Sequence, residues 1–155
     1  MQNSQKRTAL VSGANTGVGF QIAKALAENG YTVYVGSRNP EKGNAAVSKI
    51  NGDARVIQLD ITDSDSVSAA VRKIETEQGY LSLLVNNAAI STVGLPGRTM
   101  EEMLGAQRAS IVPISELKAV WETNVFATLA VTQTFLPLLR QAQNARIVTV
   151  SSSLG

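Results

Sequence analysis

The segment of residues 8–19 constrains the fold more strongly than any other part of the chain. It reads Thr-Ala-Leu-Val-Ser-Gly-Ala-Asn-Thr-Gly-Val-Gly, which predicts a short apolar strand and a glycine-rich turn, and the residues up to Gly30 predict a helix. Free N–H groups and the positive end of the helix dipole would face this turn, which suits a phosphate group. A plain tight turn is the alternative, because the G-x-x-x-G-x-G spacing differs from the dinucleotide fingerprint G-x-G-x-x-G.

Strands and helices alternate along the rest of the chain. We expect strands at residues 8–12, 32–36, 55–59, 81–85 and 146–150. Helices are expected at residues 18–29, 40–50, 65–78 and 115–143, the last with a bend near Pro137. This alternation predicts an α/β fold of the Rossmann type, a doubly wound parallel sheet with strand order 3-2-1-4-5, in one domain of residues 1–155. The glycine turn near its start makes this domain a candidate NAD(P)-binding domain.

The composition narrows the possible chemistry. The chain contains no cysteine and no histidine, which excludes disulfides, thiol nucleophiles, Ser-His-Asp triads and the common zinc sites, so we expect no metal. The formal net charge is only +2, and nucleic-acid binding is therefore not indicated. Neither a signal peptide nor a run of about 20 apolar residues is apparent. We expect a cytoplasmic protein that does not associate with membranes.

Small or polar residues follow each expected strand. In open parallel sheets, ligands bind beyond the carboxyl ends of the strands. Each of these residues could simply form a turn or a helix cap, but together they predict a binding edge. They are Ser12, Gly13, Ser37, Arg38, Asp60, Asn86, Asn87, Ser151 and Ser152.

Arg38 is the residue that bears on cofactor choice. An acidic residue about 20 positions after the glycine turn would bind the 2′-hydroxyl of NAD, whereas an arginine suits the 2′-phosphate of NADP. Positions 36–38 hold no carboxylate. We therefore predict NADP as the cofactor, with NAD less favoured. The alternative is that Arg38 only forms a surface ion pair with Glu41.

Three motifs together resemble a known family. Residues 12–19, Ser-Gly-Ala-Asn-Thr-Gly-Val-Gly, resemble the T-G-x-x-x-G-x-G turn, with Ser12 in place of threonine. Residues 86–89, Asn-Asn-Ala-Ala, resemble N-N-A-G, with Ala89 in place of glycine. Residues 147–152, Ile-Val-Thr-Val-Ser-Ser, resemble the strand that carries a catalytic serine. The chain thus resembles the N-terminal part of a classical short-chain dehydrogenase/reductase.

The resemblance implies a reaction and a set of site residues. The reaction would be hydride transfer between the nicotinamide of NADP and the carbonyl or alcohol carbon of a small-molecule substrate. Asn124 would be the family's catalytic asparagine, and Ser152 would bind the substrate oxygen. The alternative for Asn124 is a locally bonded helix residue. Cofactor-binding residues would be Gly13, Asn15, Thr16, Gly17, Val18, Gly19, Ser37, Arg38, Asp60, Ile61, Asn87 and Ala88.

The sequence departs from the family pattern in one respect that concerns catalysis. The family's proton donor is a tyrosine in a Y-x-x-x-K motif, expected roughly a dozen residues after the serine. Tyr31, Tyr34 and Tyr80 are the tyrosines present, and none of them lies in such a motif. We therefore expect the chain to bind nucleotide without turning over substrate. A non-catalytic NAD(P)-binding or sensing module is the alternative.

Two further expectations concern surfaces. The sequence stops after the fifth strand, as if truncated, and would leave that strand as an apolar edge that favours self-association. The long helix carries Leu117, Val120, Trp121, Leu129 and Phe135, which form either ordinary core or a surface that docks a partner, such as a second copy. Residues 91–115 form a long irregular segment that could be a lid or a surface insertion.

Overall fold

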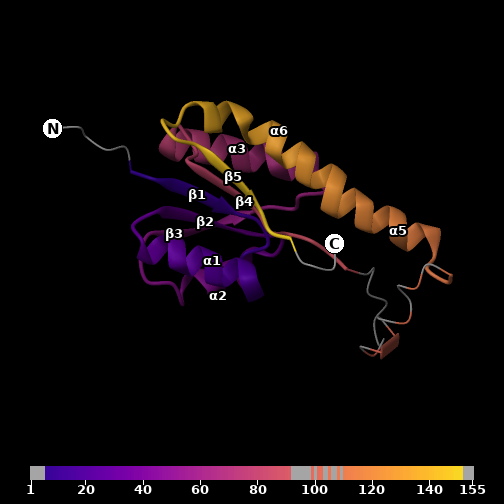
Figure 1. Cartoon of the computed structure of the whole chain (residues 1–155). Coiled ribbons are helices and arrows are strands. Elements are labelled where there is room, and N and C mark those ends of the chain that lie inside the picture. The colour runs from indigo at the N-terminus through magenta and orange to yellow at the C-terminus, as the bar shows by residue number, and fades with distance from the viewer. Residues whose placement is uncertain are drawn as a thin grey trace.

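The computed structural model describes residues 6–91, 99, 101–102, 105, 108 and 110–151. Its centre is a parallel sheet of five strands in the order β3-β2-β1-β4-β5, shown in Figure 1. The predicted α/β fold and strand order are therefore confirmed. The strands are β1 (Thr8–Val11), β2 (Thr32–Ser37), β3 (Ala54–Gln58), β4 (Leu83–Asn86) and β5 (Arg146–Thr149).

Helices cover the two faces of the sheet (Figure 1). On one face, α1 (Gly17–Glu28) and α2 (Pro40–Val47) pack with the sheet around Val11, Val35 and Val85. On the other, α3 (Ser64–Gln78) and α6 (Thr128–Arg140) pack around Leu10 and Leu84. Successive side chains of a strand point to opposite faces, so the apolar runs of the central strands supply both cores.

Side-chain caps fix where two of the helices begin. The Asn39 side chain accepts a hydrogen bond from the Lys42 N–H, and Pro40 follows as the first residue of α2. The Asp63 side chain accepts from the Asp65 N–H at the start of α3. Each cap satisfies an N–H group that the first helical turn would otherwise leave free.

The long helix differs from the expected one. It consists of α5 (Ile114–Trp121), a π-helical turn η1 (Glu122–Ala127) and α6, in direct succession. The departure from α-helical geometry therefore lies at residues 122–127, and α6 continues through Pro137. A π-turn holds one extra residue in the helix, and such turns are frequent at functional sites.

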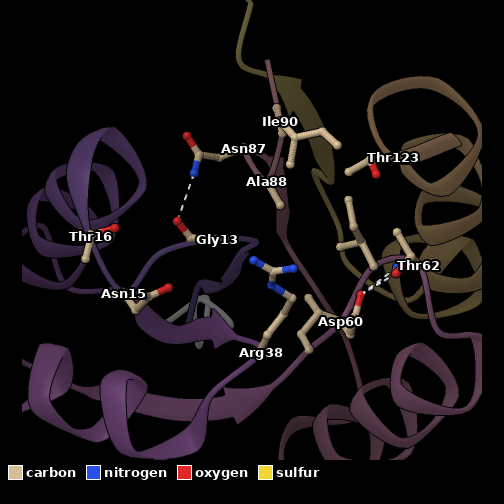
Figure 2. Close-up of a pocket in the computed structure, with 13 residues that line it drawn as sticks. Gly13, Asn15, Thr16, Arg38, Asp60, Thr62, Asn87, Ala88, Ile90 and Thr123 are labelled. Carbon is tan, nitrogen blue, oxygen red and sulfur yellow. Dashed lines mark hydrogen bonds between the residues drawn. The ribbon is translucent and has the colours of Figure 1, made fainter. Parts of the chain in front are cut away.

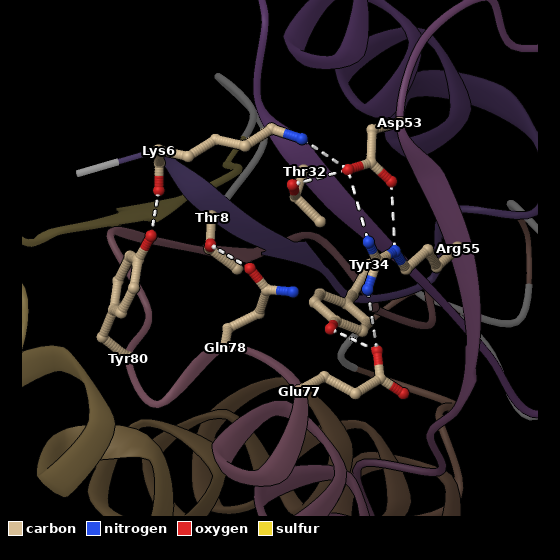
Figure 3. A network of polar contacts seen from close by, with 9 residues as sticks. All are labelled: Lys6, Thr8, Thr32, Tyr34, Asp53, Arg55, Glu77, Gln78 and Tyr80. Carbon is tan, nitrogen blue, oxygen red and sulfur yellow. Dashed lines mark hydrogen bonds and ion pairs between the residues drawn. The ribbon is translucent and has the colours of Figure 1, made fainter. Parts of the chain in front are cut away.

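A polar network stabilises the edge of the sheet where the strands begin (Figure 3). The Lys6 ammonium lies 2.6 Å from the Asp53 carboxylate, and Arg55 bonds both Asp53 and Glu77. The buried Tyr34 hydroxyl donates to Glu77 over 2.6 Å. Burial and then this bond to Glu77 raise the pKa of Tyr34 to about 12. The network ties β2 and β3 to α3.

Apolar side chains are exposed on β5 and on the first half of the long helix. Ile147 and Val148 of β5, the last strand in the sheet order, are 45% and 46% exposed. Trp121 is 54% exposed, whereas Phe135 is fully buried. The helix therefore divides into an exposed stretch and a core stretch. Self-association and a homo-oligomer through the long helix stay predictions. Within the described part of the chain, no helix is both long enough and apolar enough to cross a membrane.

Candidate cofactor site

The glycine turn between β1 and α1 is closely packed against the end of β4. Gly13 has φ +61°, and a Cβ there would lie 3.0 Å from the Cα of Ala88. A Cβ at Gly19 would lie 2.3 Å from the Asn87 amide nitrogen and 2.6 Å from the Gly13 carbonyl oxygen. Both positions therefore require glycine. Gly13 needs it for its backbone conformation and for space, and Gly19 needs it for space alone.

Hydrogen bonds hold the turn to the exit of β4. The Asn87 amide group donates to the carbonyl oxygens of Ser12 (3.0 Å) and Gly13 (3.1 Å). The Ser12 hydroxyl oxygen accepts from the backbone N–H groups of Asn87 and Ala88, both at 3.0 Å. Figure 2 shows Asn87 reaching across to Gly13. Asn87 thus steadies the turn from the neighbouring strand.

The first turn of α1 is free to receive an anion. Thr16 is its N-cap residue, with extended backbone, and its side chain makes no capping hydrogen bond. Thr16 therefore leaves the N–H groups that open this helix uncapped, and within the described residues the positive end of the helix dipole lies at the glycine turn. The turn and helix fit a diphosphate group.

A cavity of about 410 Å³ lies beyond the strand ends (Figure 2). Its volume is in the range typical of small-molecule sites. The walls come from the glycine turn, the exits of β2, β3 and β4, and η1. They are Gly13, Asn15, Thr16, Arg38, Leu59, Asp60, Ile61, Thr62, Asn87, Ala88, Ala89, Ile90 and Thr123.

Asp60 and Arg38 set the electrostatics of this cavity. The Asp60 carboxylate accepts from the Thr62 hydroxyl at 2.7 Å and from the Thr62 N–H at 2.9 Å. The bond from the Thr62 hydroxyl contributes most to lowering the pKa of Asp60, and the bond from the Thr62 N–H and the charge of Arg38 also lower it. This carboxyl is therefore ionised at neutral pH. Arg38 makes no ion pair within 4.0 Å to Glu41 or to any other residue that the structure describes.

Asn124 lies inside the π-turn and bonds the chain after β4. Its amide nitrogen donates to the Ile90 carbonyl oxygen at 2.7 Å, and its amide oxygen accepts from the Ile90 N–H at 2.9 Å. Asn124 therefore bonds a residue distant in the sequence, and the alternative of a locally bonded helix residue is wrong. Asn124 does not line the cavity itself, but it fixes Ile90, which does.

The structure brings most of the predicted cofactor residues to one place. Gly13, Asn15, Thr16, Arg38, Asp60, Ile61, Asn87 and Ala88 all line the cavity. Of the others, Gly17 lines an adjoining groove, and Gly19 packs against Asn87. Val18 is 61% exposed, and the buried Ser37 donates its hydroxyl to the Asn39 carbonyl. Ser152 lies outside the described residues, as does much of the 91–115 segment. The binding roles of all these residues stay predictions.

Sequence reasoning missed several residues of the cavity wall. Thr62 stands two positions after Asp60, and its hydroxyl is the kind of neighbour that steadies a carboxylate, so the sequence offered a signal. Ile90 and Thr123 offered none, because their place depends on how the long helix lies against the β4 exit. The remaining wall residues that were not predicted are Leu59 and Ala89.

The described tyrosines all lie away from this cavity. Tyr34 belongs to the polar network at the other end of the sheet, where the strands begin, and the Tyr80 hydroxyl donates to the Lys6 carbonyl at that end. The Arg7 guanidinium lies over the Tyr31 ring, with its Cζ 4.3 Å from the ring centroid. None of the three tyrosines of the sequence is available to the cavity as a proton donor.

Comparison with known proteins agrees with this geometry. The short-chain dehydrogenase anuI of Penicillium roqueforti is 37% identical, over 97% of this chain and 57% of the relative. Menthone neomenthol reductase from Mentha piperita has a TM-score of 0.82 at 32% identity, covering 97% of this chain and 62% of that one. A 7α-hydroxysteroid dehydrogenase in complex with NADH and 7-oxo glycochenodeoxycholic acid has a TM-score of 0.76 at 26% identity, covering 98% and 57%.

The chain therefore spans about three fifths of the length of these proteins. Nevertheless the match extends over nearly all of its own residues. The family described as short chain dehydrogenase matches residues 7–155. These residues include the glycine turn, Asn87 at the end of β4, and Asn124. The chain belongs to the short-chain dehydrogenase/reductase family of oxidoreductases.

Proposed function

We propose that this chain carries the nucleotide-binding part of an NADP-dependent oxidoreductase. The reaction is hydride transfer between the nicotinamide and a carbonyl or alcohol carbon. The observation that carries the NADP assignment is the position of Arg38, whose side chain lines the cavity at the end of β2 and has no ion-pair partner among the described residues. A guanidinium in this position suits a 2′-phosphate, because it offers paired donors and a permanent charge.

The chain's own residues divide the work of binding. The turn at Gly13 and the first turn of α1 receive the diphosphate, since their N–H groups face it. Asp60 and Ile61, which line the cavity, contact the adenine in this proposal. Asn87 supports the turn that receives the diphosphate, through its bond to the Gly13 carbonyl. The bound nicotinamide supplies the hydride chemistry, and the protein supplies orientation and water exclusion.

Asn124 is a positioning residue in this proposal. It fixes the backbone of Ile90 through two hydrogen bonds. Ile90 forms part of the cavity wall, so a fixed backbone there keeps the bound nucleotide in one orientation. A well-defined orientation is what hydride transfer needs from the protein.

A second candidate is a nucleotide-binding module without catalysis. The observation that favours it is the position of the three tyrosines, all away from the cavity. In either case we propose that the isolated 155-residue chain binds nucleotide and does not turn over substrate. Binding of NADPH without reduction of a panel of ketones and aldehydes supports this, and measurable turnover by the isolated chain contradicts it.

Cofactor choice is tested by comparing NADPH and NADH binding in the wild type and in Arg38→Asp. The substitution should weaken NADPH binding by at least about tenfold, because a charge-assisted contact becomes a repulsion. NADH binding should change much less. Arg72→Asp is the matched control, since it makes the same charge change on the exposed face of α3. An unchanged NADPH/NADH ratio in Arg38→Asp would refute the NADP assignment.

A further inference from the structure

The long helix reaches the cofactor cavity beyond the part of it that is packed in the core. Phe135 and Leu138, in α6, are buried, whereas α5 buries none of its residues. Figure 1 shows α5 extending away from the sheet. Between these two parts lies η1, which supplies Thr123 to the cavity wall. The position of η1 over the cavity therefore depends on how α6 is fixed to the sheet.

Two hydrogen bonds fix α6 to the two ends of β4. Just before the strand begins, the Leu81 N–H donates to the Leu138 carbonyl oxygen over 3.1 Å. In the last residue of the strand, the buried Asn86 amide group donates to the Thr132 hydroxyl oxygen over 3.0 Å. The Thr132 hydroxyl in turn donates to the Thr128 carbonyl oxygen, one helical turn earlier, at 3.0 Å. Among the side chains of α6, Thr132 thus supplies the hydrogen bond to the sheet in the part of the chain that the structure describes.

The Thr132 bond lies between the Leu138 bond and the cavity. Thr132 and Leu138 are six residues apart, which is about 9 Å along a helix. Thr123 lies nine residues beyond Thr132, which is about 13 Å further. Without the Thr132 bond, the helix could pivot at Leu138, and a shift at Thr132 would be more than doubled at Thr123.

We infer that Thr132 is a positioning residue for the bound nucleotide and acts through η1. This inference rests on the proposed function above. In η1, Asn124 bonds the backbone of Ile90, which forms part of the cavity wall. Ile90 follows Asn86 by only four residues, so the strand limits how far Ile90 can follow a helix that pivots. Loss of the Thr132 bond should therefore open the Asn124–Ile90 pair more often and leave the cavity wall less well defined.

Thr134 is the matched control, because a purely structural role for Thr132 is the alternative. The loss of any buried hydrogen bond lowers stability. The Thr134 hydroxyl donates to the Ala130 carbonyl oxygen at 2.7 Å, which is the same bond to the preceding turn that Thr132 makes. However, Thr134 is exposed, and it makes no hydrogen bond to the sheet among the described residues.

The test compares Thr132→Val, Thr132→Ser and Thr134→Val by amide hydrogen exchange and by calorimetry with NADPH. Valine keeps the shape of threonine and removes the hydroxyl, whereas serine keeps the hydroxyl. The buried Val33 N–H bonds the Asp53 carbonyl oxygen and reports global unfolding. In Thr132→Val, the Ile90 N–H should exchange about tenfold faster relative to the Val33 N–H, and NADPH binding should weaken about threefold to tenfold. Thr132→Ser and Thr134→Val should match the wild type in both measurements.

The two measurements separate a positioning role from a structural one. If Ile90 and Val33 exchange faster by the same factor in Thr132→Val, Thr132 contributes only to global stability and the inference is wrong. It is also wrong if Thr134→Val matches Thr132→Val, or if Ile90 exchanges faster while NADPH binding is unchanged.

Failure of the proposed function gives a different result. If the wild type binds neither NADPH nor NADH, the proposed function fails and the nucleotide role of Thr132 fails with it, while the exchange ratio still decides whether Thr132 holds η1. If Thr132→Val does not fold, Thr132→Cys replaces it, because a thiol accepts hydrogen bonds only weakly. The same comparisons of Ile90 with Val33, and of Thr132 with Thr134, then apply.

Discussion

Replacing Gly19 with alanine sets two opposing effects against each other. Alanine is the better helix former, and Gly19 lies in the first turn of α1, so propensity alone favours the substitution by up to about 1 kcal/mol. However, the added Cβ would lie 2.3 Å from the Asn87 amide nitrogen and 2.6 Å from the Gly13 carbonyl oxygen. Either the turn or the Asn87 side chain must then move.

The magnitude follows from the contacts that this movement disrupts. Forcing an extra methyl group into packed structure costs about 1–3 kcal/mol. Asn87 also loses one or both of its hydrogen bonds to Ser12 and Gly13, at about 0.5–1.5 kcal/mol each. With the middle of each range, and after the gain in helix propensity is subtracted, we expect Gly19→Ala to lower the free energy of unfolding by about 2–3 kcal/mol. For a chain of this size, that is a Tm lower by roughly 4–12 °C.

Urea and thermal unfolding, followed by circular dichroism, measure this loss. Val18→Ala is the control, because Val18 is the preceding residue in the same helical turn and is 61% exposed. It should leave the free energy of unfolding unchanged within about 0.5 kcal/mol. If Gly19→Ala proves as stable as the wild type, Asn87 is free to move away, and its bonds to the turn do not hold the site together.

Two further predictions concern the other hydrogen-bonded regions. Asn124→Ala removes both hydrogen bonds to the Ile90 backbone and should lower the free energy of unfolding, measured in urea, by about 1–3 kcal/mol. The control is Gln133→Ala, because Gln133 is exposed; if the two variants are equally stable, the positioning role is contradicted. The bond from Lys6, with help from Thr32 and Arg55, lowers the pKa of Asp53 from 3.8 to about 2. Because the folded pKa lies below the unfolded one, the ionised Asp53 stabilises the fold above about pH 4, and this stabilisation is lost as the pH falls towards about 2. Asp53→Asn should therefore flatten the pH dependence of the free energy of unfolding in this range, and an unchanged slope would count against the network.

Much of the fold could be predicted because local signals agree with it. Asn39 and Asp63, which are of the residue types favoured at N-cap positions, cap α2 and α3. The end of α2 was less clear, because Ile50 is buried and continues the apolar pattern, although the helix ends at Val47. Similarly, Leu81 is buried and apolar, yet its N–H bonds the Leu138 carbonyl instead of a neighbouring strand. The apolar pattern reports burial, and burial extends beyond the regular elements.

The π-turn could not be predicted from periodicity. It adds one residue to the helix, so a stripe drawn at a constant angle per residue is out of phase on one side of residues 122–127. The expected stripe also failed for a second reason, because α5 buries none of its residues, so Trp121 is exposed whereas Phe135, in α6, is buried. The signal that the sequence did offer was Asn124, a polar residue among apolar ones.

The candidate site followed from topology more than from any single motif. Once the sheet order is 3-2-1-4-5, Asn15, Arg38, Asp60 and Asn87 must gather at one edge, because parallel strands end at the same side. Side chains on the long helix could not be placed in this way. Thr123 reaches the cavity only because η1 lies against the β4 exit.

The bonds between Asn87 and the glycine turn also bear on the thermodynamics of ligand capture. Because folding itself fixes the Ser12 and Gly13 carbonyls, and the Ala14 N–H bonds the Gly36 carbonyl, the backbone of the turn is held before any nucleotide arrives. The entropy of ordering this loop is then lost once, when the chain folds, and not again at each binding event. In the proposed function, a nucleotide therefore meets a turn that is already ordered, and less of its contact energy is lost to ordering the loop.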